Sequence, residues 1–145
     1  MHDVDKIMAM LDWNESIETQ QQGIELAKNI NSINVFIQPL HQGCSKNVWD
    51  NCAIILADKS DEVLSPYSIN LLEWIEDINW PGAMTILERL KQFSDVEMLS
   101  FAVVECAKRA KAVDGETWLI SIAELLNNEK LKAAIPADIL AVLQQ

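Results

Sequence analysis

The 145-residue sequence contains few of the residues on which turn-rich and disulfide-bonded folds depend. It has four glycines, four prolines and three cysteines. So few glycines and prolines argue against a β-sandwich or barrel, which needs many turns. The cysteines are odd in number and form no Cys-x-x-Cys pair, which is typical of a reducing cytoplasm rather than of a disulfide framework. We therefore expect residues 1–145 to form a single domain that folds around a hydrophobic core.

Long apolar runs are also missing. The longest run, residues 52–57, is far shorter than the roughly 20 residues that cross a bilayer. The first 13 residues carry three aspartates and one lysine, whereas a secretory signal begins with basic residues followed by an apolar stretch. We expect a cytoplasmic protein without a membrane segment.

Positive charge is scarce. Eleven lysines and arginines face 22 aspartates and glutamates, a net charge of −11. Nucleic-acid binding depends on lysine and arginine, so this balance argues against it, and an anionic membrane surface is disfavoured for the same reason. The acids are concentrated in residues 1–77, which hold 13 acids and 4 bases. The expected partner is a basic protein.

The sequence offers little for catalysis. It contains two histidines and no HExxH, GxSxG or phosphate-binding loop. His41 and Cys44 are three residues apart and could form an activated thiolate, but we favour the simpler interpretation of a loop histidine beside a packed cysteine. Carboxylates one helical turn apart are typical of a solvated helix face, and no helical glutamate has a histidine at a metal-binding spacing. We expect no enzymatic activity, no metal and no cofactor.

Almost every segment has helical periodicity. The clearest case is the run after Ser94, where apolar residues recur in steps of three and four up to Val113. Residues 33–40 are ambiguous between a strand and a helix, because their apolar residues partly alternate. We interpret them as helical because no other segment of the chain could pair with them as a strand. Helices are expected to begin at Val4, Ser16, Ser45, Ser65-Pro66, Asn79-Trp80-Pro81, Ser94 and Glu116, with two short helices on either side of Pro136.

Three of these segments resemble one another. Each has a tryptophan, a small residue three positions later and a leucine seven positions later, so that all three side chains share one helix face. The segments begin at Trp49, Trp80 and Trp118. A repeat of about one helical hairpin predicts an all-α fold of eight to ten helices, stacked as an α-solenoid. Chance similarity between helices of an ordinary bundle is the alternative.

The spacing of these residues resembles HEAT-type repeats, and residues 71–83 resemble a more specific pattern. They read LLEWIEDINWPGA, similar to the Leu-Leu-x-Trp-x-x-Asp-x-Asn-Trp-Pro-x-Ala signature of a family of small bacterial helical domains. Such domains, and small acidic HEAT-like proteins generally, occur among the immunity proteins of polymorphic-toxin and contact-dependent inhibition systems. The resemblance implies an immunity protein, and it extends beyond these thirteen residues only in architecture.

Clustered acids indicate where a basic partner would bind. Crowded like charges destabilise a fold, so they suggest a complementary surface on a partner, and they accelerate its capture. Trp13 and Trp74 are flanked by polar and acidic residues and are candidate aromatic anchors, whereas the three repeat tryptophans are expected in the core. The predicted partner-binding residues are Asp12, Glu15, Asp58, Asp61, Glu62, Glu73, Trp74, Glu76 and Asp77.

These observations lead to two hypotheses about function. The first is an immunity protein that neutralises a basic bacterial toxin, such as a nuclease, by covering its active site with these acids. The second is a housekeeping scaffold or adaptor that binds its partner through an apolar groove. Electrostatic capture weakens with ionic strength, whereas groove binding hardly does.

Overall fold

The computed structural model describes residues 4–38 and 45–144. Within these ranges every regular element is an α-helix or a short 3-10 helix, which confirms the all-α prediction. The α-helices are α1 (Val4–Met10), α2 (Ile17–Ala27), α3 (Trp49–Ala57), α4 (Asp61–Leu64), α5 (Ser68–Trp74), α6 (Ala83–Lys91), α7 (Glu97–Ala112), α8 (Glu116–Ala123), α9 (Glu129–Ala134) and α10 (Ala137–Leu143). The 3-10 helices are η1 (Asn34–Phe36), η3 (Lys46–Val48), η4 (Ser65–Tyr67) and η5 (Glu124–Asn127).

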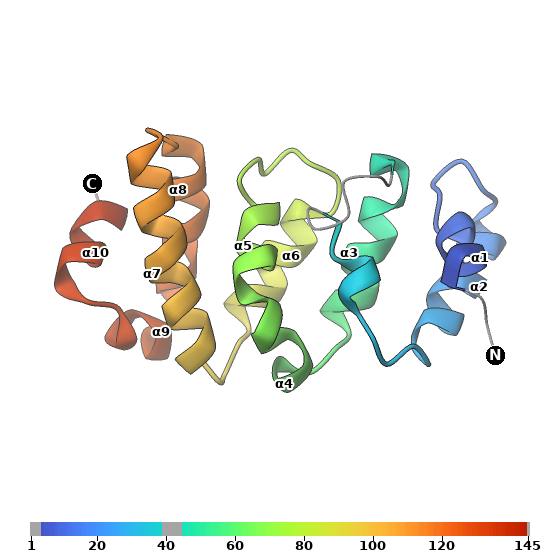
Figure 1. Cartoon of the computed structure of the whole chain (residues 1–145), viewed down its shortest axis with the longest axis horizontal. Helices are drawn as coiled ribbons and strands as arrows, with labels where there is room; N and C mark the ends of the chain where they lie inside the picture. Colours follow the sequence, from blue (N-terminus) through green and yellow to red (C-terminus); the bar gives the residue numbers. More distant parts are fainter. Residues whose placement is uncertain (1–3, 39–44, 145) are drawn as a thin grey trace.

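The helices form a row that follows the order of the sequence. In Figure 1 the chain runs up and down across the long axis, from α1 and α2 at one end to α9 and α10 at the other. Alternate helices pack side by side, α5 against α7 and α3 against α6. One layer thus contains α1, η1, α5 and α7, and the second contains α2, α3, α6 and α8 with η5.

The three similar segments found in the sequence all belong to this second layer. They coincide with α3, with α6 and the turn before it, and with α8 continued by η5. The small residue of each segment, Cys52, Ala83 or Ser121, is buried. The three small residues therefore face the interior, where a short side chain leaves room for a neighbouring helix.

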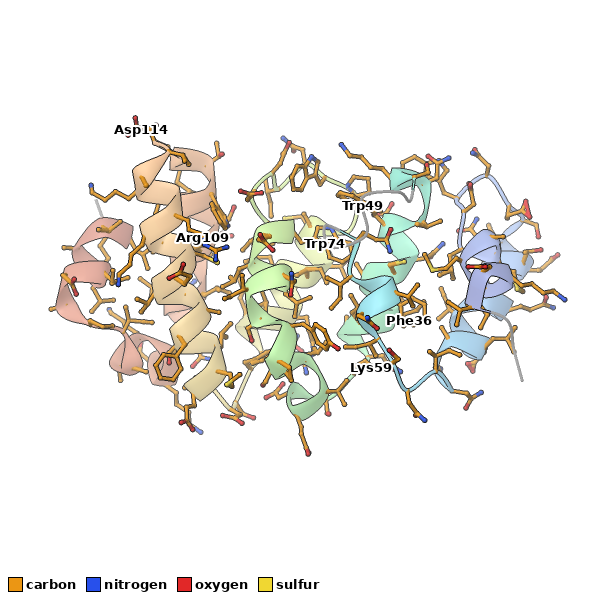
Figure 2. The ribbon with its side chains drawn as sticks, in the orientation of Figure 1. Phe36, Trp49, Lys59, Trp74, Arg109 and Asp114 are labelled. Atoms are coloured by element: carbon orange, nitrogen blue, oxygen red, sulfur yellow. The ribbon has the colours of Figure 1, made fainter. Side chains whose placement is uncertain are left out.

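Local capping explains most of the helix boundaries. The backbone N–H of Thr19 donates to the Ser16 hydroxyl (3.1 Å), and that of Asn47 donates to Ser45 (3.1 Å), so both predicted starts are confirmed. The long helix α7 is followed by Asp114, which has a left-handed backbone with φ 54°. Asp114 lies on the upper edge in Figure 2, where the chain turns from α7 into α8.

Three boundary predictions differ from the structure. Pro66 lies in the first turn of η4, which leads into α5 as predicted, but Ser65 is not the cap, because its hydroxyl donates to the Asp61 carbonyl (2.7 Å). Pro81 does not start a helix, since α6 begins at Ala83 after Gly82. In the segment predicted as helical over residues 33–40, residues 34–36 form the 3-10 turn η1 and not an α-helix, and residues 39 and 40 lie outside the described ranges.

The middle of the row is held together by tryptophans. Trp49 packs edge-on against Trp74 and against Trp80, with ring centroids 5.7 Å apart in both pairs. The indole N–H of Trp118 donates to the Leu72 carbonyl (2.9 Å) and thereby joins α8 to α5. A buried hydrogen bond of this kind contributes about 1 kcal/mol, and the burial of each indole adds more.

Packing explains the thirteen-residue signature. Leu71, Leu72 and Trp74 are fully buried, and the Trp74 indole N–H donates to the Pro81 carbonyl (2.9 Å), which closes the loop between α5 and α6. Gly82 adopts φ 81° directly beneath this ring. These residues therefore determine the conformation of the loop between α5 and α6, and packing is enough to explain the thirteen-residue pattern.

No helix in the described part of the chain is long and apolar enough to cross a membrane.

Candidate functional site

The predicted acidic residues lie on two opposite edges of the row. In Figure 1 the loops between α1 and α2 and between α5 and α6 reach the upper edge, whereas α4 lies at the lower edge. Asp58 and Glu62 accordingly belong to the lower edge, since they flank the turn into α4. The sequence groups them with Glu76 and Asp77 as one acidic cluster, but they do not form one patch, because the length of α5 separates the two groups.

Asp61 has a structural role instead of an exposed one. Its carboxylate accepts hydrogen bonds from Arg89 (2.7 Å) and from the backbone and hydroxyl of Ser94 (2.9 and 3.1 Å). Burial would raise the pKa of Asp61, but the hydrogen bonds from Arg89, Ser94 and Asp95 outweigh burial and hold this pKa below its ordinary value. The side chain joins α4 to the end of α6, so it is not free to meet a partner.

Of the two candidate aromatic anchors, the structure exposes Trp13, which the list of predicted partner-binding residues leaves out. Trp74 is completely buried, so its prediction as a partner-binding residue is wrong. Its ring fills the space between Trp49 and the loop after α5, toward the interior in Figure 2. Trp13 is 46% exposed on the loop between α1 and α2. A half-exposed indole beside acidic residues is typical of an interface anchor.

Two contacts connect the loops of the upper edge. The backbone N–H of Trp13 donates to the Asn47 carbonyl (3.1 Å), which fixes the α1–α2 loop against η3. The Lys46 ammonium lies 5.6 Å from the ring centroid of Trp49 and 5.5 Å from that of Trp80, and so joins η3 to the loop before α6. Cation–π contacts of this kind contribute about 0.5–1 kcal/mol each at exposed sites. These contacts hold the α1–α2 loop and the α5–α6 loop against η3 at the upper edge of the row.

We call this surface the acidic edge and define it as Asp12, Trp13, Glu15, Glu76 and Asp77. Asp12 is partly exposed and the other three acids are exposed. Among the described residues, none of the four carboxylates forms an ion pair with a lysine or arginine. Their charges are therefore available to a partner.

The surroundings of Glu76 disfavour its ionised form. Partial burial raises its pKa, and the nearby charge of Glu73 raises it further. Glu73 itself is compensated in part, since it lies 3.8 Å from Arg109, which also pairs with Glu105 on α7 (3.1 Å). Glu73 thus lies at the border of the acidic edge, where its carboxylate is close both to Arg109 and to Glu76. A cation brought close to Glu76 would relieve the repulsion between these two carboxylates.

The other residues considered for chemistry contribute less. Burial raises the pKa of the Cys106 thiol to about 12, and Cys52 is also buried, so both pack as apolar residues. His41 and Cys44 lie outside the described residues. In the part of the chain that the structure describes, no three acidic, cysteine or histidine side chains gather closely enough to hold a metal ion.

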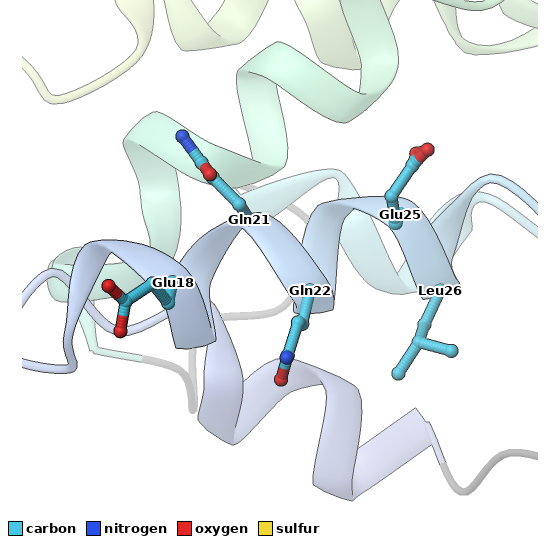
Figure 3. A pocket seen from close by; sticks show the side chains of 5 residues that line it. All are labelled: Glu18, Gln21, Gln22, Glu25 and Leu26. Carbon is cyan, nitrogen blue, oxygen red and sulfur yellow. The ribbon is translucent and has the colours of Figure 1, made fainter.

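The second layer carries a different kind of surface. Ile54 on α3, Met84 on α6 and Ile120 on α8 are 46%, 53% and 67% exposed. Hollows lie between α2 and α3, between α3 and α6, and between α8 and α10. Another hollow, along the outer face of α2, is lined by polar side chains and Leu26 (Figure 3).

Reasoning from the sequence missed Lys46 and Trp80 as parts of the upper edge. The available signal was the position of Lys46, three residues before a tryptophan and one residue after a helix cap. Its contact with Trp80 depends on how α3 and α6 pack, and no local pattern encodes that contact.

Comparison with known proteins places most of the chain in one family. No curated protein and no solved structure matches the chain. Residues 45–141, about two thirds of the sequence, match a family described as a domain of unknown function (DUF5071). The match covers η3 and the helices from α3 to α9 completely and most of α10, and it leaves out α1, α2 and η1. The chain thus belongs to the DUF5071 family.

Proposed function

We propose that this chain is a non-enzymatic protein-binding protein whose acidic edge captures a basic partner. The observation that carries the proposal is that exposed acids without a lysine or arginine partner lie on two loops of the same edge, one of which also carries the half-exposed Trp13. Acids at the rim of an interface speed the encounter with a basic protein, while a central aromatic residue supplies the buried contact.

The proposed partner is a basic toxin domain, such as a nuclease, and the chain is then its immunity protein in the bacterial cytoplasm. A nuclease surrounds its active site with lysine and arginine because its substrate is a polyanion. An acidic protein that covers this site blocks the substrate by charge and by bulk, and it needs no chemistry of its own. The resemblance of residues 71–83 to domains found among immunity proteins supports this proposal.

For the fold, we propose that the row is a HEAT-like α-solenoid. The recurrence of tryptophan, small residue and leucine in α3, α6 and α8 supports this assignment, because all three segments lie in the same layer. In a solenoid each hairpin buries its apolar face against its neighbours.

The experiment compares two variants with equal charge change. In the first, Glu76→Lys and Asp77→Lys reverse part of the acidic edge; in the second, Asp58→Lys and Glu62→Lys reverse exposed acids on the lower edge. Each tagged protein is used to capture partners from a lysate of the source organism, at low and at high salt. The expected result is one basic protein that binds the wild type and the lower-edge variant but not the acidic-edge variant, and that is released by salt.

Two results would contradict the proposal. One is a basic partner that binds the acidic-edge variant as well as the wild type. The other is a partner whose binding does not depend on ionic strength. Co-expression completes the test, since a captured toxin should arrest growth alone and should be harmless together with the wild-type chain.

The second candidate function is a scaffold or adaptor that binds through an apolar groove. The exposed Ile54, Met84 and Ile120 of the second layer favour it. Several partners that resist high salt, and that are lost when Ile54 and Met84 are changed to Glu, would support the adaptor over the immunity protein.

A further inference from the structure

A groove between α8 and α10 is lined by apolar side chains, by Asn127 and by two glutamates. Its hollow has a volume of about 500 Å³. Leu119, Ile120 and Ala123 line one side, from α8, and Val142 and Leu143 line the other, from α10. Ile120 is 67% exposed although it belongs to this apolar surface. The groove leaves several apolar side chains of two helices open to a partner, and such concave apolar surfaces are where ligands and partner helices bind.

The charges around the groove are all negative. Glu116 and Glu124 are the charged residues that line it, and both side chains are exposed. Eight residues separate them, which corresponds to about 12 Å along a helix at 1.5 Å per residue. This separation is close to two turns of a second helix laid beside α8. Glu116, Ile120 and Glu124 follow one another at intervals of four residues, so they form a single stripe.

We propose that this groove binds a basic amphipathic helix of another protein. Such a helix would place its apolar stripe on Ile120 and the side chains of α10, with lysines or arginines seven residues apart opposite Glu116 and Glu124. A second copy of this chain fits poorly because each copy carries a net charge of −11 and the two would repel each other. The groove shares no residue with the acidic edge, so this second site is independent of the proposed function.

The probe is a synthetic alanine-based peptide with a helical stripe of leucines at i, i+3, i+4 and i+7 and two lysines seven residues apart beside the stripe. A control peptide has glutamates in place of the lysines. Fluorescence anisotropy of the labelled peptides measures binding to the intact chain, and amide NMR shifts at Ile120 and Ala123 locate it. The lysine peptide should bind saturably and the glutamate peptide should not.

Two variants of the groove are compared with matched controls elsewhere. Ile120→Glu removes the exposed apolar contact and is paired with Ile54→Glu on α3, which is also exposed. Glu116→Gln with Glu124→Gln removes the two charges and is paired with Asp12→Asn and Glu15→Gln on the acidic edge. Circular dichroism confirms that each variant is folded. The groove variants should weaken binding of the lysine peptide about tenfold, which corresponds to about 1.4 kcal/mol, and the controls should leave it unchanged.

The proposal is overturned if the lysine peptide does not bind saturably, or if both peptides bind equally well. It is also overturned if Ile54→Glu or the acidic-edge control weakens binding as much as the groove variants do. Loss of peptide binding in the acidic-edge control alone would assign the peptide to that edge, and the groove would then have no role in it.

Discussion

Replacement of Gly82 by alanine tests whether the loop between α5 and α6 has the shape described above. Gly82 has φ 81°, a conformation that costs a residue with a side chain about 1–2 kcal/mol. A Cβ atom would also lie 2.8 Å from the Cβ of Ala53, 2.8 Å from the Trp49 carbonyl oxygen and 3.0 Å from the Trp74 ring. The Ala53 Cβ and the Trp49 carbonyl oxygen both belong to α3, so neither atom can move without shifting that helix.

The expected loss in the free energy of unfolding is the sum of the backbone strain and the steric clash, reduced by a small gain from the unfolded chain. Forcing a methyl group into a closely packed site costs about 1–3 kcal/mol. Alanine also restricts the unfolded chain, which returns about 0.4–1 kcal/mol. Gly82→Ala should therefore lower the free energy of unfolding by about 2–4 kcal/mol, a large share of the roughly 5–15 kcal/mol typical of a domain.

Urea unfolding followed by circular dichroism measures this loss, with Gly115→Ala as the matched control. Gly115 has an ordinary φ of −80°, and a Cβ there would lie 3.3 Å from the Ala110 carbonyl oxygen, so the control should lose less than about 1 kcal/mol. Equal losses in the two variants, or a loss under about 1 kcal/mol in Gly82→Ala, would refute this account of the loop.

Three other predictions concern single side chains. Asp61→Asn should lower the free energy of unfolding by roughly 1–3 kcal/mol at neutral pH, because it weakens the largely buried pair with Arg89. Because the pKa of Asp61 is lowered in the folded state, the wild type loses the stabilisation from this pair as the pH falls through that pKa. In urea unfolding, the difference in free energy of unfolding between the wild type and Asp61→Asn should therefore narrow below about pH 4. Glu76→Gln should slightly raise the free energy of unfolding at pH 7, because the raised pKa of Glu76 means that folding disfavours its ionised form. This gain should vanish in acid, where the glutamate is already neutral. Thermal melts at pH 7 and in acid check this, with Glu62→Gln as the control. Cys106 should resist iodoacetamide at pH 8 in the folded protein and react after unfolding, as peptide mass mapping would show, because burial raises its thiol pKa to about 12.

The features that could be predicted from the sequence are those set by neighbouring residues. Ser16 and Ser45 start helices as predicted because a hydroxyl and an N–H two or three residues later suffice for a cap. The apolar face of α7 follows from its period, since Leu99, Val103 and Cys106 are all buried.

The features that could not be predicted depend on contacts between distant elements. Trp74 is flanked by acids in the sequence, yet its ring is buried because Trp49 and the Pro81 carbonyl enclose it from elsewhere in the chain. Asp61 looks like part of an acidic cluster until α6 brings Arg89 to it. The position of an acid in the sequence therefore says little about the edge on which it lies, since one short helix carries the chain from one edge to the other.

The arrangement of hairpins in a row also bears on how such chains evolve. The principal contacts of each hairpin are with its neighbours, and the two ends of the row lie at opposite extremes of the molecule. In the α-solenoid proposed above, a hairpin can be gained or lost at an end with changes confined to its immediate neighbour. The hairpin of α1 and α2, which precedes the residues that match the family, fits an addition of this kind. Its outer side chains Glu18, Gln21 and Gln22 face water, so a related chain that lacks it would need polar residues on the side of α3 that would then be uncovered.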